Sequence, residues 1–290
     1  MTAQVERKAV DQAAHLFDAT LGARRLQERY RSENTMATGP WNAVIATLLN
    51  HRSVRAFSDE QVSDDILERA IAVAQSAATS SNLQAWSVIA VSDAMKKARL
   101  AELAGSQAYV AKCPLFLLWL VDLSRIERIG DEKGHETEAL KYTDTFLSGL
   151  IDVSLAAQNA VSAFESLGLG TTYIGGMRNR PTGAASELDL PANVMVAFGM
   201  CVGYPDPKVN TAIKPRLPSE LVIHREKYRH SIPDAVLADY DERARSFQIE
   251  QGMKPLGWTD HALERMRGPE AMSGRDKLKD EMSGLGFQML

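Results

Sequence analysis

The chain has 290 residues, of which 45% are hydrophobic and 24% charged, a composition typical of a globular protein that buries a full core. Its formal net charge is −4 and its pI is about 5.9, so it has no general attraction to nucleic acid or anionic lipid. Nucleic-acid binding is therefore disfavoured, and an anion site would have to be a local cluster of cations.

Targeting, cysteine and histidine patterns bear on the compartment of the protein and on metal binding. No stretch approaches the roughly 20 apolar residues of a membrane span, and residues 1–8 lack the apolar run of a signal peptide. Cys113 and Cys201 each lie beside an apolar run, which favours reduced, buried thiols over a secreted disulfide. The six histidines show no metal-ligand spacing. We expect a cytoplasmic protein with no metal site and no membrane partner.

The chain begins with a helical pattern over residues 5–31, followed by a polar linker over 34–40 and a helix from Trp41 to Asn50. We divide it into an N-terminal helical extension and linker (1–40), a core (41–230) and a C-terminal helical extension (231–290).

Cations are concentrated directly after the helix that starts at Trp41. His51, Arg52, Ser53 and Arg55 place two guanidinium groups, an imidazole and a hydroxyl within five positions. Arginine offers a fork of N–H donors that matches phosphate oxygens. This corner indicates a site for a phosphate monoester, and the alternative is a solvated basic turn that complements a helix C-terminus.

A second helix is predicted from Ser63, as its N-cap, to about Ala74, and it leads into small polar residues over 78–84. The run Thr79, Ser80, Ser81 either lines a polar ligand or forms an ordinary loop. Strands are predicted over 86–91 and 114–121, the second buried on both faces, with a helix over 95–104 between them. Residues 126–143 are charged and are expected to form an exposed excursion, either a lid or a solvated loop.

The strongest helical pattern covers residues 148–167, and its alanine-rich face suits either a central core helix or a subunit interface. The glycines that follow do not form a dinucleotide fingerprint, because they follow a helix and Tyr173 occupies the third glycine position. Gly175 and Gly176 end a short strand, where they allow either close backbone approach to a flat ligand or a simple turn.

The remaining elements are a strand over 194–203, helices over 233–250 and 259–267, and a polar tail over 268–290 with a weakly apolar end. Between them, prolines hold Lys214 and Arg216 in an extended segment, so that both cations point the same way. This is a second two-cation element, and the alternative is a basic surface loop.

Six motifs occur in order over about residues 51–228: His-Arg-Ser-Val-Arg, Thr-Ser-Ser-Asn-Leu-Gln, Ser-Leu-Gly-Leu-Gly, Tyr-Ile-Gly-Gly-Met-Arg-Asn, Phe-Gly-Met-Cys-Val-Gly-Tyr-Pro and Lys-Pro-Arg-Leu-Pro. Together they resemble the nitroreductase family, in particular its type A oxygen-insensitive nitroreductases and Frp-type NADPH-flavin reductases. The resemblance implies an α+β fold with a central, mostly antiparallel sheet flanked by helices, and an intertwined homodimer with FMN at the subunit interface.

The resemblance also implies roles for individual residues. The phosphate side of FMN would be held by His51, Arg52, Ser53, Arg55, Lys214 and Arg216. The partner subunit would contribute Thr79, Ser80 and Ser81. Gln107 would bond the flavin, and Tyr173, Ile174, Gly175 and Gly176 would run along its ring.

The activity implied is that of an NAD(P)H-dependent oxidoreductase with a ping-pong order. NADPH or NADH would pass a hydride to FMN and leave before a nitroaromatic, a quinone or free flavin takes the electrons. The cofactor carries this chemistry, so no catalytic side chain is assigned. Arg52, Lys214 or Arg216 would favour negative charge on the reduced ring. The alternatives are a dehalogenase or flavin-modifying enzyme of the same fold, and a non-catalytic flavin binder.

Three features depart from the family pattern. Type A members carry arginines after the long C-terminal helix for the 2′-phosphate of NADPH, whereas residues 249–255 here contain only Lys254 as a basic residue. This leaves the use of NADH open. Asn82 and the following Ala85-Trp86 differ in the loop beside the acceptor, and residues 1–38 have no counterpart.

Overall fold

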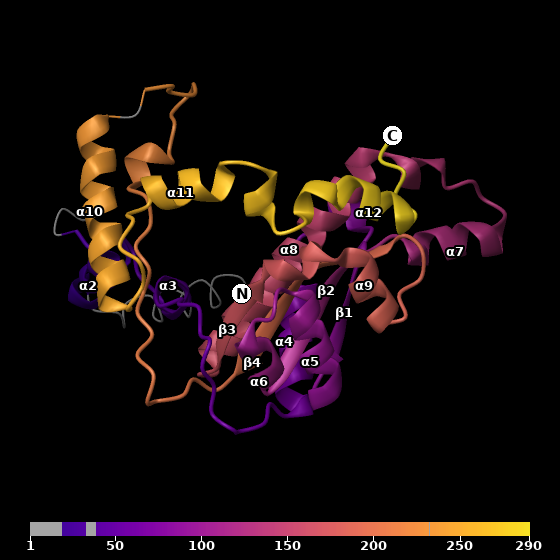
Figure 1. The fold of residues 1–290 in the computed structure, drawn as a ribbon, viewed down its shortest axis with the longest axis horizontal. Helices are drawn as coiled ribbons and strands as arrows, with labels where there is room; N and C mark the ends of the chain where they lie inside the picture. The colour runs from indigo at the N-terminus through magenta and orange to yellow at the C-terminus, as the bar shows by residue number, and fades with distance from the viewer. Residues whose placement is uncertain (1–18, 33–38, 232) are drawn as a thin grey trace, which may run out of the picture. The chain divides into compact units, whose positions relative to one another are not determined.

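The structure, a computed structural model, describes residues 19–32, 39–231 and 233–290, so most of the helix predicted over 5–31 lies outside the described residues. The chain forms two compact units, each built from two separate stretches (Figure 1). The first unit is formed by the described residues of Met1–Arg52 with Asn210–Met266, and the second by Ser53–Val209 with Arg267–Leu290. Each unit is described by itself.

A four-stranded sheet forms the centre of the second unit. Its strands are β1 (Trp86–Val91), β2 (Leu115–Asp122), β3 (Gly170–Ile174) and β4 (Val194–Gly203). They lie in the order β1-β2-β4-β3, and every neighbouring pair is antiparallel. All eight residues of β2 are buried, as the unbroken apolar run predicts for a strand covered on both faces. The α+β class with an antiparallel sheet is confirmed.

Helices cover both faces of this sheet. One core contains apolar residues of α4 (Asp64–Gln75), α8 (Thr143–Ser166) and α12 (Leu278–Gly284). The other contains residues of α5 (Ala94–Leu103), α6 (Ala108–Lys112) and α9 (Pro181–Glu187). Short 3-10 helices join these elements: η1 (Ser80–Asn82), η2 (Glu138–Lys141), η3 (Gly175–Asn179), η5 (Pro269–Met272) and η6 (Arg275–Lys277).

A β-bulge in β4 decides which of its residues face each core. The register with β2 shifts at Trp119/Leu120, where Phe198 and Val196 are the successive partners and Ala197 is left over. Because side chains alternate with a period of two, one extra residue exchanges the faces. Val196 and Cys201 consequently pack in the same core although their numbers differ in parity.

The structure adds detail to three sequence-based expectations in the second unit. Residues 126–143 are mostly exposed, as expected, and much of this segment forms helix α7 (Ser124–Lys133) and η2, with Gly134 ending α7 at φ 66°. The polar tail contains α12, whose Met282 is buried together with Phe287, because scattered apolar residues meet the core only after folding. Ser63 is the N-cap of α4, but its side chain makes no capping hydrogen bond.

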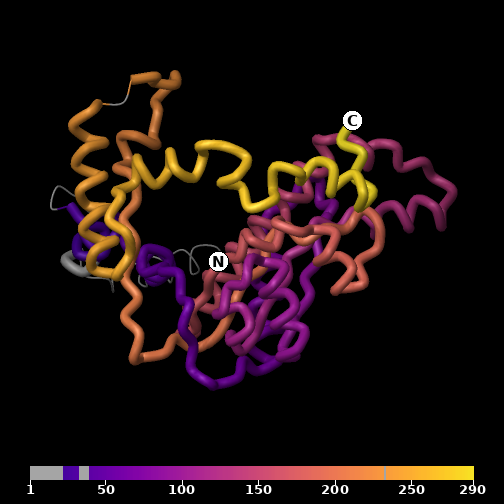
Figure 2. The backbone as a smooth tube through the Cα atoms, in the orientation of Figure 1, coloured from indigo at the N-terminus to yellow at the C-terminus, as the bar shows by residue number. Residues whose placement is uncertain are grey.

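The first unit is helical, with α2 (Ala19–Tyr30), α3 (Ala43–Leu49), η4 (Ser219–Leu221), α10 (Asp234–Glu250) and α11 (Thr259–Met266). Figure 2 shows the indigo chain of α2 beside the orange chain of α10. Arg243 of α10 donates to the carbonyl oxygen of Tyr30 at 2.8 Å, which joins the two helices. Among the described residues, no helix is long and apolar enough to cross a bilayer.

Candidate functional site

A buried arginine that the sequence analysis did not single out brings two predicted cation elements together in the first unit. Arg29 is 7% exposed, and its Nη2 donates to the carbonyl oxygens of Leu49 at 2.8 Å and His51 at 2.6 Å. Its Nη1 donates to the carbonyl oxygen of Lys214 at 3.1 Å. One guanidinium therefore fixes the backbone of the His51 corner beside the Lys214 segment.

The two segments carry the side chains of His51, Arg52, Lys214 and Arg216. Arg52 Nε donates to Thr211 Oγ1 at 3.3 Å, so the first cation element contacts the chain just before the second. Lys214 and Arg216 are exposed on either side of buried Pro215, which agrees with the predicted extended segment. At about 4 Å, a cation–phosphate pair is worth roughly 1 kcal/mol in water and about 4 kcal/mol in a partly dry cleft. Several such cations suit a phosphate monoester.

Ser53 and Arg55 belong to the second unit, where they flank the edge of the sheet. Ser53 forms a parallel bridge with Thr171 of β3, and the amide of Val54 donates to the carbonyl oxygen of Thr171 at 2.9 Å. Val54 is 2% exposed, while Ser53 and Arg55 are both exposed. This alternation places the hydroxyl and the guanidinium on the same outer side of the segment.

Gln107 and Gly176 are neighbours in space although 69 positions separate their numbers (176 − 107). A methyl group added at Gly176 would lie 2.3 Å from the carbonyl oxygen of Ala104 and 2.8 Å from Gln107 Nε2. Only glycine fits this approach. Gln107 Nε2 donates to Ala104 O at 2.8 Å, and its Oε1 accepts a hydrogen bond from the hydroxyl of Tyr109. These bonds hold the amide next to the backbone of η3.

Tyr173 and Ile174 end β3 with different exposures. The Tyr173 ring meets Phe198 edge to face at 5.2 Å between centroids, and its hydroxyl donates to Gln158 Oε1 at 3.4 Å. Burial raises the pKa of Tyr173 above its usual range, so the phenol stays protonated at neutral pH. Ile174 is 1% exposed, so its side chain packs in the core.

The loop that contains Thr79, Ser80 and Ser81 has an unusual backbone. Ser81, Asn82 and Gln84 have φ values of 50°, 55° and 49°, and left-handed conformations at residues other than glycine cost energy and concentrate at functional sites. The amide of Ser80 donates to Asp152 Oδ1 of α8 at 2.9 Å. The fold therefore stabilises a conformation that the loop sequence does not favour by itself.

Asp152 of α8 contacts this loop, and the sequence pattern did not lead us to it. It is 1% exposed, and its Oδ2 has no hydrogen-bond partner among the described residues. Asp152 precedes Ala156 and Ala160 by four and eight positions, on the face of α8 that packs in the core. A carboxylate inside an apolar stripe was the signal that could have identified it. Arg29 offered no comparable signal, because its helix is rich in charged residues.

The described residues thus present two kinds of binding surface. In the first unit, backbone atoms of His51, Lys214 and Arg216 are hydrogen-bonded to Arg29, and Arg52 follows His51 in the chain. The second unit carries Ser53, Arg55, Gln107, the end of β3 and the 79–84 loop. The cations of the first unit suit a phosphate, and the glycine backbone of the second unit permits close approach of a flat ring, so each unit by itself carries residues that fit a part of FMN. Within the described ranges, no three His, Cys, Asp or Glu side chains group so as to hold a metal ion.

Comparison with known proteins agrees with the fit of these residues to FMN. The model of the nitroreductase family matches residues 48–204, and that of the nitroreductase family C-terminal domain matches residues 214–290. The chain is 38% identical over 251 residues to the FMN reductase (NADPH) of Bacillus subtilis, covering 85% of this chain and 98% of the relative. It is 37% identical over 219 residues to the oxygen-insensitive NADPH nitroreductase of Salmonella typhimurium, covering 75% and 88%. The solved structure of the NADPH:FMN oxidoreductase of Vibrio harveyi complexed with NAD+ superposes with a TM-score of 0.75 at 32% identity, covering 85% of this chain and 99% of that one.

Proposed function

This chain belongs to the nitroreductase family, and on that premise we propose that it is an FMN-dependent NAD(P)H oxidoreductase that reduces nitroaromatics, quinones or free flavin. The observation that carries the proposal is that Arg29 joins the two cation-bearing segments at His51 and Lys214, because a family match alone does not say whether a chain retains the means to hold a phosphorylated cofactor. The names of the similar proteins, which combine FMN, NADPH and nitroreduction, support it.

The residues of the first unit would hold the phosphate of FMN. His51, Arg52, Lys214 and Arg216 are the candidates there, joined by Ser53 and Arg55 directly along the chain. Gly175 and Gly176 would leave room for the ring beside Tyr173, and Gln107 would hydrogen-bond to it. When bound, FMN supplies the redox chemistry between the nicotinamide nucleotide and the acceptor. The chain's own cations would favour negative charge on the reduced cofactor.

The outer face of α8 supports a homodimer. Leu147, Ile151 and Leu155 follow one another at four-residue spacing and are 46%, 58% and 44% exposed, while Val153 and Ala156 of the same helix are fully buried. A helix that is apolar on its outer side as well as its inner side is expected to pack against a further surface. A second copy is the proposed occupant. Asp152, next to Ile151, holds Ser80, which would place the 79–84 loop beside the partner's cofactor.

The proposed location is the cytoplasm, where buried thiols such as those of Cys113 and Cys201 stay reduced.

The decisive experiment is anaerobic titration of the purified protein with NADH and NADPH while the visible flavin absorption is followed. A yellow protein that bleaches and then recovers its colour with a nitroaromatic or a quinone supports the proposal. A flavin that neither nucleotide reduces would point to a non-catalytic binder. We expect Arg52→Ala and Lys214→Ala to bind FMN at least about tenfold more weakly. Lys208→Ala removes an exposed cation of the second unit and serves as the matched control.

A further inference from the structure

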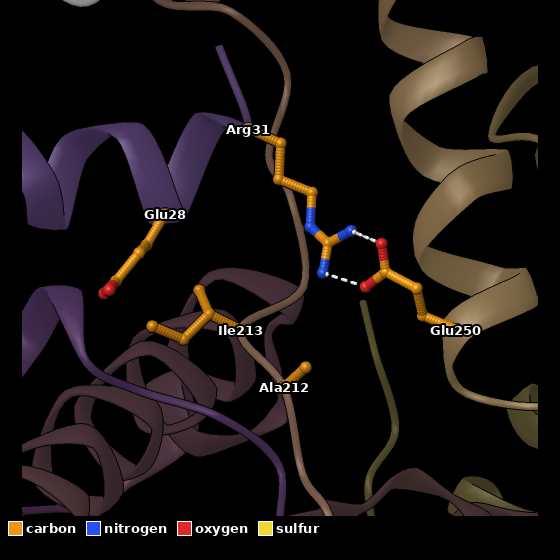
Figure 3. A pocket seen from close by; sticks show the side chains of 5 residues that line it. All are labelled: Glu28, Arg31, Ala212, Ile213 and Glu250. Carbon is orange, nitrogen blue, oxygen red and sulfur yellow. Dashed lines mark hydrogen bonds and ion pairs between the residues drawn. The ribbon is translucent and has the colours of Figure 1, made fainter. Parts of the chain in front are cut away.

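The charged side chains around a cavity in the first unit are paired with other side chains. This cavity, of about 460 Å³, is lined by Glu28, Arg31, Ala212, Ile213 and Glu250. Figure 3 shows Arg31 bonded to both oxygens of Glu250, while the Glu28 carboxylate points away from that pair and is bonded to Arg25. Gln107, in the second unit, is different, because its side chain keeps hydrogen-bonding capacity beside a proposed ligand site.

Gln107 lies between a turn with an unusual backbone and the short helix α6. It is the N-cap residue of α6, but its side chain makes no capping hydrogen bond. The two preceding residues, Gly105 and Ser106, have φ values of 91° and 57°, and the amide of Ser106 donates to the carbonyl oxygen of Ala101 at 2.8 Å. A left-handed serine costs energy and is typical of functional sites. This turn places the carbonyl oxygen of Ala104 2.8 Å from Gln107 Nε2.

Two hydrogen bonds allow only one orientation of the Gln107 carboxamide. The carbonyl oxygen of Ala104 can only accept, so the amide atom that faces it must be the nitrogen, Nε2. The hydroxyl of Tyr109 meets the other atom, Oε1, and must donate to it, because an amide oxygen only accepts. Turning the amide over would bring two oxygen atoms together at Ala104. The two contacts therefore select the same orientation.

These two bonds leave part of the carboxamide for a ligand. A carboxamide has two N–H donors and two lone pairs on its oxygen. Ala104 takes one donor and Tyr109 takes one lone pair, so one N–H and one lone pair remain. They lie beside the backbone of Gly176, where an added methyl group would be 2.8 Å from Gln107 Nε2. The backbone that admits a flat ring is thus next to atoms that can bond it.

The Tyr109 bond also changes the strength of the remaining donor. A hydrogen bond accepted by the oxygen of an amide polarises the group and strengthens its N–H donors, by roughly 10–30% per bond. The phenol, the carboxamide and an acceptor on a ligand would form one chain of hydrogen bonds. An acceptor that gains negative charge when it is reduced benefits most from such a donor.

We propose that Tyr109 is a positioning residue of the flavin site, which holds the Gln107 carboxamide in one orientation and strengthens the N–H that this side chain offers to the flavin ring. Tyr109 packs against the core that contains α5, α6 and α9, and its carbonyl oxygen accepts from the amide of Cys113 at 3.0 Å. Its place is therefore fixed without a ligand. This inference rests on the proposed oxidoreductase function and adds one residue to its site.

The first test needs no cofactor. Tyr109→Phe removes only the hydroxyl, so one of the two bonds that restrain the carboxamide is lost. In the FMN-free protein, hydrogen exchange of the Gln107 side-chain amide, followed by NMR, should become at least about threefold faster. Tyr142→Phe removes the hydroxyl of a tyrosine that is 50% exposed. It is the matched control and should leave the exchange rate of Gln107 unchanged.

The second test uses the holoenzyme. Tyr109→Phe should weaken FMN binding at least about threefold, and it should lower the reduction potential of the bound flavin because the donor to the reduced ring is weaker. Gln107→Met should lower both quantities as well. Adding Tyr109→Phe to Gln107→Met should then produce no further change in potential, because Tyr109 acts through that amide. A hydroxyl with a packing role only would change stability but not the potential.

Three results would overturn the inference while the oxidoreductase proposal stands. These are an unchanged exchange rate of Gln107 in Tyr109→Phe, a native potential in that variant, and an equal shift in potential with and without Gln107→Met. A native chain whose bound flavin neither NADH nor NADPH reduces would instead remove the oxidoreductase function, and this role of Tyr109 with it.

Discussion

The guanidinium of Arg29 donates to the carbonyl oxygen of His51 at 2.6 Å. Arg29 belongs to the N-terminal helix α2, and His51 begins the cation corner, so a residue outside the family match positions residues inside it. The same guanidinium reaches Lys214. The N-terminal helix is therefore part of the architecture that would hold the cofactor phosphate.

Replacing Arg29 should consequently damage both stability and cofactor affinity. Arg29→Ala leaves three carbonyl oxygens without their donor, which we expect to lower the free energy of unfolding by about 3 kcal/mol and to weaken FMN binding. Urea unfolding of the apoprotein and fluorescence titration with FMN measure the two effects. Arg24→Ala, on the same helix with a side chain 74% exposed, should cost less than about 1 kcal/mol. Equal losses in both variants would contradict the positioning role.

The two glycines after β3 allow the effect of packing on stability to be tested separately from the effect of ligand contact on FMN affinity. Gly176→Ala would place a methyl group 2.3 Å from Ala104 O and should destabilise the protein by about 1–3 kcal/mol through overpacking. At Gly175 the nearest atom to such a methyl group is Arg178 Nη2 at 3.4 Å, so Gly175→Ala should unfold like the native chain. We expect Gly175→Ala to weaken FMN binding without a loss of stability. Thermal unfolding with FMN titration checks this, and normal FMN affinity in Gly175→Ala would remove Gly175 from the site.

Asp152 should control the 79–84 loop. Asp152→Ala removes the acceptor of the Ser80 amide, which we expect to cost about 1–3 kcal/mol and to let the strained loop relax. Hydrogen exchange at the Ser80 amide should accelerate, and FMN affinity of the dimer should fall. Ser166→Ala removes an exposed hydroxyl from the end of the same helix and should change neither quantity. An unchanged exchange rate in Asp152→Ala would show that the loop holds its conformation without the carboxylate.

The pairing of Arg31 with Glu250 should make a small contribution to stability that depends on pH. The hydrogen bond from Arg31 depresses the pKa of Glu250, so this contribution is fully present above the unfolded pKa of about 4.3 and disappears as the pH falls through the lower, folded value. Because the Glu250 side chain is 53% exposed, the effect at pH 7 should stay below about 1 kcal/mol. Urea unfolding of the native chain and Arg31→Ala at pH 7 and at pH 3 measures it. A difference that grows toward acid pH would contradict the sign.

Charge on the outer face of α8 should dissociate the proposed dimer. Ile151→Glu puts a carboxylate in the middle of the Leu147–Leu155 row, and burying it at a contact is unfavourable. Sedimentation should then give the 31.9 kDa of one chain in place of twice that mass, with loss of bound FMN. Leu263→Glu introduces the same charge on α11, at a position 64% exposed, and should leave the mass unchanged. A native chain that sediments as a monomer would refute the dimer directly.

The sequence by itself determined the elements whose patterns are long and regular. The apolar runs at Val194–Gly203 and Trp86–Val91 became strands with the predicted bounds, and the alanine-rich stripe around Ala156 became the long helix α8. It also determined the family, because six separate motifs in a fixed order restrict the alternatives far more than any single motif does. Local periodicity and local chemistry are properties of short stretches, and these can be read without a fold.

Only the tertiary structure decided how distant residues combine. Nothing in the charged sequence around Arg29 shows that it would be buried among the carbonyl groups of Leu49, His51 and Lys214. The bulge at Ala197 reverses which β4 residues face each core, and the closeness of Gly176 to Gln107 arises from the packing of η3 on the turn before α6. The cavity at Glu28 and Glu250 joins residues more than 200 positions apart. Such contacts are set by the packing of whole elements, which the residues of one stretch do not specify.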